Sequence, residues 1–259
     1  MIVDTEAIVL RGRDYSDSSR ILVLYTLSHG RLSAIAKGVK RLAARHGLSL
    51  EPMSHIRAVL YVKESRDLQL LSRFESLEPL GGLMADMDKM AAGLAVVELL
   101  GAATPQAESN QALFQLLAST LRALKGATKH PRNALYHFEV HLLSELGFQP
   151  NFENCASCGK PVGGEGGSDR RTARMGNAGV VCPSCIDRHY GLFPVSHEAL
   201  TSLRELQRVG TAEEAVTRDL CAHHGEEVDA ALRRCMQMNV DALGKLKTRE
   251  VFHALGQTP

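Results

Sequence analysis

Four cysteines in two pairs are the feature that most constrains the fold of this 259-residue chain. The pairs are Cys155-Ala-Ser-Cys158 and Cys182-Pro-Ser-Cys185, and each has the C-x-x-C spacing that lets two thiolates bind one metal ion. Two such pairs complete the tetrahedral shell of a zinc ion and leave no position for water. The sequence therefore predicts a closed, structural Zn²⁺ site and argues against a catalytic one.

The stretch between the two pairs is rich in glycine and arginine and poor in apolar residues. A stretch of this kind cannot bury a core of its own, so metal binding is expected to fold it. His189, four residues after Cys185, is an alternative ligand that could replace one cysteine. Cys221 and Cys235 have no C-x-x-C partner, and we expect them to be ordinary residues of helices.

Composition places the chain among soluble globular proteins, with 44% hydrophobic and 23% charged residues. No apolar run reaches the about 18 to 20 residues that a membrane helix needs. The first residues include Asp4 and Glu6, where a signal peptide carries positive charge. We expect a cytoplasmic protein without a membrane partner, and in that compartment C-x-x-C pairs favour a metal over a disulfide.

A net charge of +1 hides one strongly basic segment between residues 31 and 63. Its only acidic residue is Glu51. A local basic face on a nearly neutral protein is typical of phosphate-backbone binding, although a merely solvated surface is the alternative interpretation. The predicted DNA contacts are the cations of this segment, namely Arg31, Lys37, Lys40, Arg41, Arg45, Arg57 and Lys63.

The first eighty residues are typical of β-structure. Five short runs of β-branched and apolar residues predict strands, and these runs are Thr5–Leu10, Ser19–Leu27, Arg31–Lys37, His55–Lys63 and Leu68–Phe74. Five strands in this length suit a small barrel such as the OB-fold. The pattern does not distinguish an OB-fold from an SH3-like barrel.

The remainder of the chain is typical of helix on both sides of the cysteines. Apolar spacing predicts helices over 86–103 and 110–127, and a third from Pro131 to Gly147. After the cysteines, Ser196 is expected to begin a helix, a capping box at 211–214 begins the next, and Gly225 is expected to end that one before a last helix towards residue 245. The predicted fold is a multi-domain α+β protein, with an OB-like DNA-binding barrel at 1–80, a helical domain at 81–150 and 195–259, and a zinc-finger insertion at 151–194.

Several catalytic motifs are missing from the sequence. It has no Gly-x-x-x-x-Gly-Lys-Ser/Thr loop, no Gly-x-Gly-x-x-Gly after a strand, no Gly-x-Ser-x-Gly and no His-Glu-x-x-His. No acidic metal cluster is evident, which a nuclease-like enzyme would need. We therefore assign no catalytic residue and expect a binding protein rather than an enzyme.

The order of these parts resembles the RecO family of bacterial recombination mediators. The barrel region carries the resemblance at Thr5–Leu10, Tyr15–Ile21, Thr26–Leu32 and Ala36–Arg41. The helical region carries it at Phe138–Glu139 and at Leu142–Pro150, which ends in Leu-Gly-Phe-Gln-Pro shortly before Cys155.

The resemblance implies a set of activities. Members of that family bind single- and double-stranded DNA, anneal complementary strands and work with the partner protein RecR. They contact single-stranded-DNA-binding protein and help to load the RecA recombinase. The resemblance therefore implies a role in DNA repair, recombination and the DNA damage response, at the nucleoid in the cytoplasm. A rival function is that of a zinc-containing, sequence-specific DNA-binding regulator, although no helix-turn-helix is recognisable.

A second basic group lies where the second predicted helix ends and the third begins. Its members are Arg122, Lys125, Lys129 and Arg132. Part of this group is explained by cations that complement the negative end of a helix dipole. The resemblance implies a further use, in which these residues capture the acidic C-terminal tail of single-stranded-DNA-binding protein beside an apolar pocket.

Overall fold

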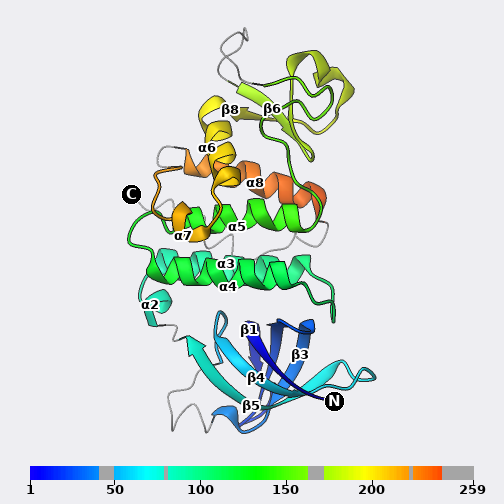
Figure 1. Cartoon of the computed structure of the whole chain (residues 1–259), viewed down its shortest axis with the longest axis vertical. Coiled ribbons are helices and arrows are strands. Elements are labelled where there is room, and N and C mark those ends of the chain that lie inside the picture. Colours follow the sequence, from blue (N-terminus) through cyan, green and yellow to red (C-terminus); the bar gives the residue numbers. More distant parts are fainter. Residues whose placement is uncertain (41–49, 79–80, 163–171, 222–223, 241–259) are drawn as a thin grey trace. The chain divides into compact units, whose positions relative to one another are not determined.

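The computed structural model describes residues 1–40, 50–78, 81–162, 172–221 and 224–240. The chain forms two compact units (Figure 1). Of the described residues, those up to Gly126 belong to unit 1, and those from Ala127 onward belong to unit 2. Strands and helices occur in both units, so the predicted α+β class is confirmed.

A closed five-stranded barrel begins unit 1, in the strand order β1-β2-β3-β5-β4 (Figure 1). The strands are β1 (Ile2–Asp14), β2 (Arg20–Thr26), β3 (Gly30–Ala36), β4 (His55–Tyr61) and β5 (Leu68–Glu78). Only β3 and β5 pair in parallel. β1 is long enough to pair with β4 through its first half and with β2 through its second. The barrel is OB-like, as predicted.

A bulge in β1 decides which of its side chains face solvent. Val9 pairs with Leu24 and Arg11 pairs with Val23, so Leu10 is an extra residue in the ladder. Without this insertion the strand would alternate regularly and Arg11 would point into the barrel. Because of the bulge, Arg11 and the next alternate residue, Arg13, are exposed on the outer side of the barrel.

Besides the barrel, the described part of unit 1 contains the helices α2 (Gly81–Met84), α3 (Met87–Ala103) and α4 (Gln111–Gly126). The Asp86 carboxylate caps α3 by accepting from the backbone N–H groups of Asp88 and Lys89. The ring of Phe114 on α4 stacks on buried Tyr25 of β2, with 6.5 Å between ring centroids. Helix packing therefore covers the end of β2 that carries Tyr25.

The described part of unit 2 contains helices and a small sheet. The helices are α5 (Arg132–Glu145), α6 (His197–Arg208), α7 (Ala212–Ala215) and α8 (Gly225–Asn239). The predicted caps are confirmed, because the Ser196 hydroxyl accepts from the N–H of Ala199 and the Thr211 hydroxyl accepts from that of Glu214. The role predicted for Gly225 is wrong. It begins α8, whose first turn holds Glu226 and Glu227, as the helix dipole favours.

The sheet of unit 2 lies within the cysteine module and was not predicted. It consists of β6 (Thr172–Gly176), β7 (Gly179–Val181) and β8 (Phe193–Ser196) in the order β7-β6-β8, with a short 3-10 helix, η1 (Pro183–Arg188), between β7 and β8. Met175, Val180 and Phe193 are buried in it. Met175 and Val180 lie between the two cysteine pairs, so the described part of this stretch buries apolar side chains, contrary to the expectation from the sequence.

The predicted domain boundaries differ from the division into units. The helical domain predicted at 81–150 and 195–259 is shared between the two, because α2 to α4 belong to unit 1 and α5 to α8 to unit 2. The boundaries themselves stay a prediction. None of the described helices is both long and apolar enough to span a membrane.

Two histidines lie one turn apart on α5, and His137 is buried while His141 is half-buried. The rings of His137 and His141 are 4.1 Å apart between centroids, and His137 Nε2 lies 3.1 Å from the carbonyl oxygen of Val209. Burial, together with the neighbouring charge of His141, lowers the pKa of His137 to about 4. Both imidazoles are therefore neutral in the folded chain near pH 7, because burial also lowers the pKa of His141.

This pair predicts a loss of stability in acid. The unfolded chain takes up a proton on His137 below its usual pKa of about 6.5, whereas the folded chain takes it up only near pH 4. The neutral imidazole makes its full contribution to the free energy of unfolding above pH 6.5. This free energy falls by about 3 kcal/mol as the pH drops to 4. His137→Gln, which keeps a donor towards Val209, should flatten this part of the profile in urea unfolding. An unchanged profile would contradict the assignment.

Candidate nucleic-acid face and metal centre

Hydrogen bonds within unit 2 bring the two cysteine pairs together. The backbone of Asn151 pairs with the turn at β7, accepting from Val180 N–H at 2.9 Å and donating to the Ala178 carbonyl at 3.0 Å. Gly179 makes this approach possible, since it has a φ of +113° and a Cβ there would lie 2.1 Å from the Asn151 oxygen. The loop of the first pair is thus held against the strand that leads into the second.

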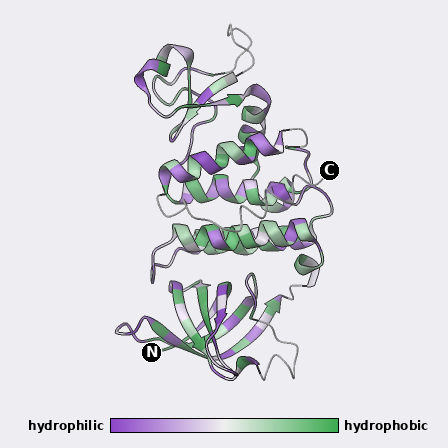
Figure 2. Cartoon of the chain, turned by 180° about the vertical axis from the view of Figure 1, so that it is seen from behind, coloured by the Kyte–Doolittle hydropathy of each residue, from purple (hydrophilic) through white to green (hydrophobic). Residues whose placement is uncertain are grey.

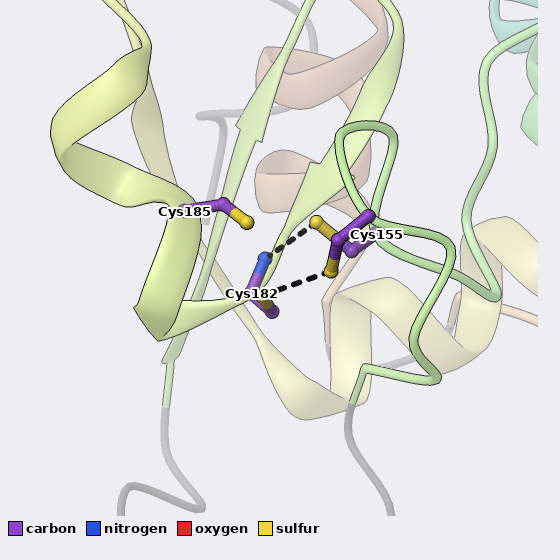
Figure 3. A group of neighbouring side chains, drawn as sticks. Cys155, Cys182 and Cys185 are labelled. Atoms are coloured by element: carbon purple, nitrogen blue, oxygen red, sulfur yellow. Dashed lines mark hydrogen bonds between the residues drawn. The ribbon is translucent and has the colours of Figure 1, made fainter.

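The four sulfur atoms converge on one space (Figure 3). All four Sγ atoms lie within 4.8 Å of one another, and Cys158 Sγ is 3.7 Å from Cys182 Sγ. The backbone N–H of Cys182 donates to Cys155 Sγ at 3.3 Å. Three of the cysteines are buried and Cys158 is exposed. The predicted ligands Cys155, Cys158, Cys182 and Cys185 therefore form one cluster.

This cluster fits a tetrahedral metal ion. A Zn–S distance of about 2.3 Å implies sulfur atoms about 3.8 Å apart at the corners of the tetrahedron, and the 3.7 Å separation of Cys158 and Cys182 agrees with that spacing. The four cysteines could hold a metal ion. His189 is not part of the cluster, because its Nε2 lies 3.1 Å from the Ser157 hydroxyl. Cys235 lies in α8, as predicted, but Cys221 lies in a bend before α8, so the helix predicted for it is wrong. Burial raises the pKa of each thiol to about 12.

Arg204 of α6 joins the helices to the loop of the first cysteine pair. Its guanidinium donates to the carbonyl oxygen of Phe152 at 2.8 Å and to that of Val162 at 2.5 Å. These two residues lie on either side of Cys155 and Cys158. The arginine therefore fixes both ends of the loop that presents the two sulfur atoms, which is how a supporting residue orients metal ligands.

The outer side of β1, β2 and β3 carries three arginines, Arg11, Arg13 and Arg31, which we call the arginine face. Arg11 pairs with Val23 of β2, and Arg13 pairs with Ile21. β2 and β3 contain no acidic residue. Within the part of the chain that the structure describes, none of the three arginines has an ion-pair partner. An excess of positive charge on one side of a barrel is the arrangement that phosphate groups require.

Arg31 shows how the charges on this face affect one another. Burial first, and then the charge of Arg11, lower the pKa of Arg31. Its Nε is buried and has no hydrogen-bond partner among the described residues. Two like charges held close together, one with an unused donor, favour a bound anion because an anion relieves their repulsion.

The structure distributes the predicted DNA contacts over several places. Arg31 belongs to the arginine face, Lys37 is exposed directly after β3, and Lys63 is exposed beyond the end of β4. Lys40 lies 2.8 Å from the carboxylate of Asp14, which matches its charge. Arg41 and Arg45 lie outside the described residues. The assignment of these residues to DNA stays a prediction.

Arg57 lies on a different side of the barrel, which we call the acidic face. Its Nε donates to Asp4 at 2.9 Å, and that bond, with the charges of Asp4, Glu75 and Glu6, raises its pKa. The outward positions of β1 before the bulge and of β5 are thus rich in carboxylates. The prediction from the sequence missed Arg11 and Arg13 because it counted charges only from residue 31 onward. The Arg-Gly-Arg motif at 11–13 is the signal that could have identified them.

The aromatic residues available for stacking are few. Of the four in the barrel, Tyr25 is fully buried and Phe74 packs against the core. Tyr15 and Tyr61 remain exposed, at 64% and 47% of their surface. Exposed cations therefore outnumber exposed aromatic rings on this barrel.

The second basic group is divided between the units. Arg122 and Lys125 lie on α4 in unit 1, whereas Lys129 and Arg132 lie in unit 2. Lys125 lines a small pocket with the apolar side chains of Met53, Leu83 and Leu121, and the carboxylate of Glu78 forms part of the same lining. Arg122 Nε donates to that carboxylate at 3.2 Å.

The OB-like barrel, the helices and the four-cysteine cluster together define a multi-domain α+β protein with an OB-like domain. Comparison with known families gives a closer assignment. Residues 1–80 match the family model "Recombination protein O N terminal", and residues 84–250 match "Recombination protein O C terminal". The chain therefore belongs to the RecO family, and the predicted resemblance is confirmed.

Named relatives agree over nearly the whole chain. The DNA repair protein RecO of Symbiobacterium thermophilum is 30% identical over 254 residues, which is 98% of each chain. That of Anaeromyxobacter dehalogenans is 32% identical over 254 residues, 98% of this chain and 97% of the relative. Membership of this family supports a role in DNA repair.

Proposed function

We propose that this chain is a non-enzymatic recombination mediator that binds DNA through the arginine face of its barrel. The observation that carries the proposal is the set of three arginines on the outer side of the barrel, two on β1 and one on β3. β2 and β3 contain no acidic residue. Contacts of this kind are made with phosphates, so affinity should depend strongly on salt and little on sequence. Both single and double strands present such phosphates.

Strand annealing follows from the same chemistry. A protein that neutralises phosphates lowers the repulsion between two complementary strands without any covalent step. The family membership supports cooperation with RecR, contact with single-stranded-DNA-binding protein and help in loading RecA, in the cytoplasm at the nucleoid. A sequence-specific regulator is the alternative, and it would need side chains aimed at base edges in a groove.

We also propose that the four clustered cysteines bind a structural zinc ion. Four thiolates fill the tetrahedral shell of Zn²⁺ and leave no position for a substrate. Bound zinc would hold the loop at Cys155 to the start of η1 at Cys185, and it would supply folding free energy to the module.

Annealing tests the proposed function directly. Complementary strands coated with single-stranded-DNA-binding protein should anneal faster with the purified chain than without it, and high salt should abolish the effect. One strand carries a fluorophore and the other a quencher, so annealing is measured as a decrease in fluorescence. A chain that binds no DNA and leaves annealing unchanged would refute the proposal. Strong preference for one duplex sequence over random DNA would favour the regulator instead.

We further propose that the pocket beside α4 receives the acidic, apolar tail of single-stranded-DNA-binding protein. Lys125 lines the pocket and Arg122 lies beside it, so cations meet the carboxylates while Leu83 and Leu121 contact the apolar residue. Glu78 opposes this binding, because it is an acid in the pocket lining and it occupies Arg122.

Two substitutions with opposite effects test the pocket. Arg122→Glu should weaken binding of a labelled tail peptide by about tenfold, because it places two acids at the pocket. Glu78→Gln should strengthen binding, since it removes the competing acid and releases Arg122. Arg66→Glu, an exposed cation in the turn between β4 and β5, is the control with the same charge change. Fluorescence anisotropy measures all three, and equal affinities would count against the pocket.

A further inference from the structure

The cysteines of the chain differ in their access to solvent. The structure describes all six, and Cys158 alone is exposed. The turn that carries it, residues 156–161, is exposed throughout, and polar and apolar residues are interspersed along the module (Figure 2). The other three members of the cluster, Cys155, Cys182 and Cys185, are buried. A reagent dissolved in water therefore reaches one sulfur of the cluster before the others.

Metal binding keeps this exposed sulfur in its reactive form. A cysteine that holds zinc is a thiolate, and the thiolate is the form of cysteine that attacks electrophiles. Zinc itself has no redox chemistry, so an oxidant at such a centre must take its electrons from sulfur. Exposure and thiolate character together decide which cysteine of a protein is oxidised first. Both point to Cys158.

A second sulfur lies close enough to complete the oxidation. Cys158 Sγ is 3.7 Å from Cys182 Sγ. A disulfide bond is about 2.05 Å long, so the two sulfur atoms need to approach by about 1.7 Å to form one. The backbone N–H of Cys182 donates to Cys155 Sγ at 3.3 Å, which joins the two cysteine pairs by a bond that needs no metal.

Further contacts hold the turn of Cys158 beside the second cysteine pair without any metal. The N–H of Ala156 donates to the carbonyl oxygen of Val180 on β7 at 2.8 Å. The hydroxyl of Ser157 lies 3.1 Å from Nε2 of His189, directly after η1. These two contacts immediately precede Cys158 in the chain. The sulfur pair therefore stays close when an oxidant has begun to dismantle the metal shell.

We propose that Cys158 is the site at which peroxide oxidises this protein, and that Cys182 then forms a disulfide with it and releases the zinc. The inference rests on the zinc site proposed above and adds a reversible reaction of its ligands. Reduction of the disulfide by a dithiol restores four thiolates, and the site binds metal again.

The reaction has two steps that balance in atoms and electrons. The Cys158 thiolate attacks one oxygen of hydrogen peroxide, so that an S–O bond forms, the O–O bond breaks and hydroxide leaves. The Cys182 thiolate then attacks the sulfur of the resulting sulfenic acid, so that an S–S bond forms, the S–O bond breaks and a second hydroxide leaves. The two sulfurs lose two electrons, which the peroxide gains. Two thiolates remain, which is half of a tetrahedral shell.

Oxidation of the zinc-loaded wild-type chain tests the proposal. Hydrogen peroxide should release one zinc ion per chain to a chromophoric chelator while one disulfide forms. Alkylation of the remaining thiols and peptide mapping should show Cys158 joined to Cys182, with Cys155 and Cys185 alkylated. Dithiothreitol with added zinc should restore the metal content. Zinc that stays bound in peroxide, or a disulfide between any other pair, would overturn the proposal.

Two histidine substitutions separate exposure from ligand chemistry. Cys158→His keeps a zinc ligand but removes the exposed thiolate, so release of zinc by peroxide should slow by at least about tenfold. Cys185→His makes the same change at a buried position and should release zinc within about twofold of the wild-type rate. Equal rates for the two variants would contradict the role of Cys158.

Limited alkylation supplies a readout that needs no variant. Substoichiometric N-ethylmaleimide should label Cys158 of the wild-type chain before the three buried cysteines, and labelling of a buried cysteine first would refute the assignment. A wild-type chain that binds no zinc would contradict the proposed metal site and this inference with it. A chain that holds zinc and resists peroxide overturns the oxidation of Cys158 alone and leaves the zinc site standing.

Discussion

Replacing Arg11 and Arg13 together with glutamate should weaken binding of single-stranded DNA on the order of 100-fold near physiological salt. Each substitution removes a phosphate contact and adds a repulsion on the same outer side of the barrel. The slope of log affinity against log salt should become shallower by about 1.4, since each phosphate contact contributes about 0.7 for a single strand. Fluorescence anisotropy across a salt series measures both quantities. Duplex affinity should fall as well, because phosphates are common to both forms.

The acidic face supplies the matched control. Arg57→Glu with Arg73→Glu makes the same change in net charge on strands β4 and β5 of the same barrel. Arg57 is bonded to Asp4, so its charge is matched before any DNA arrives. This pair of substitutions should alter affinity by less than about threefold. Equal weakening by the two pairs would show that DNA responds to net charge alone and would contradict an arginine face.

Replacing Cys182 with alanine should remove one zinc ion per chain and unfold the cysteine module. Structural zinc contributes about 10 to 16 kcal/mol of binding free energy in small zinc domains, so the loss of one of four ligands is expected to release the ion. Metal analysis measures the stoichiometry, and hydrogen exchange should show lost protection over β6 to β8. The barrel belongs to the other unit and should keep its DNA affinity.

Cys235→Ala is the control for this change. It also removes a buried thiol of unit 2, but Cys235 lies on α8, outside the cluster of four sulfurs. This variant should retain the metal and the exchange protection of β6 to β8. Retention of zinc by Cys182→Ala would contradict the four-thiolate site. Selective loss of DNA affinity in a folded, zinc-free chain would instead assign DNA contacts to the module.

Local patterns predicted most of the elements. The five strands were recognised because β-branched runs end at turns such as His29-Gly30, and Gly30 has a φ of +59°. The caps at Ser196 and Thr211 were recognised because a hydroxyl before a helix has a specific partner. The four ligands were recognised because spacing alone defines a metal site of this kind.

Features that depend on register could not be predicted in this way. The bulge at Leu10 reverses which side of β1 faces solvent, and no local pattern around Arg11 reveals it. Neighbours across the strands are also distant in the sequence, since Ile2 and Leu70, which are 68 positions apart, are both register partners of Tyr61. Gly225 was misassigned because glycine also occurs at the start of helices.

Closure of the barrel has a consequence for behaviour in solution. Open sheets expose unpaired backbone groups at an edge strand, and an apolar surface beside such an edge promotes addition of strands from other chains. Here β1 pairs with both β2 and β4, so the ring of hydrogen bonds is complete. The barrel therefore offers no unpaired edge strand as a template for strands of other chains.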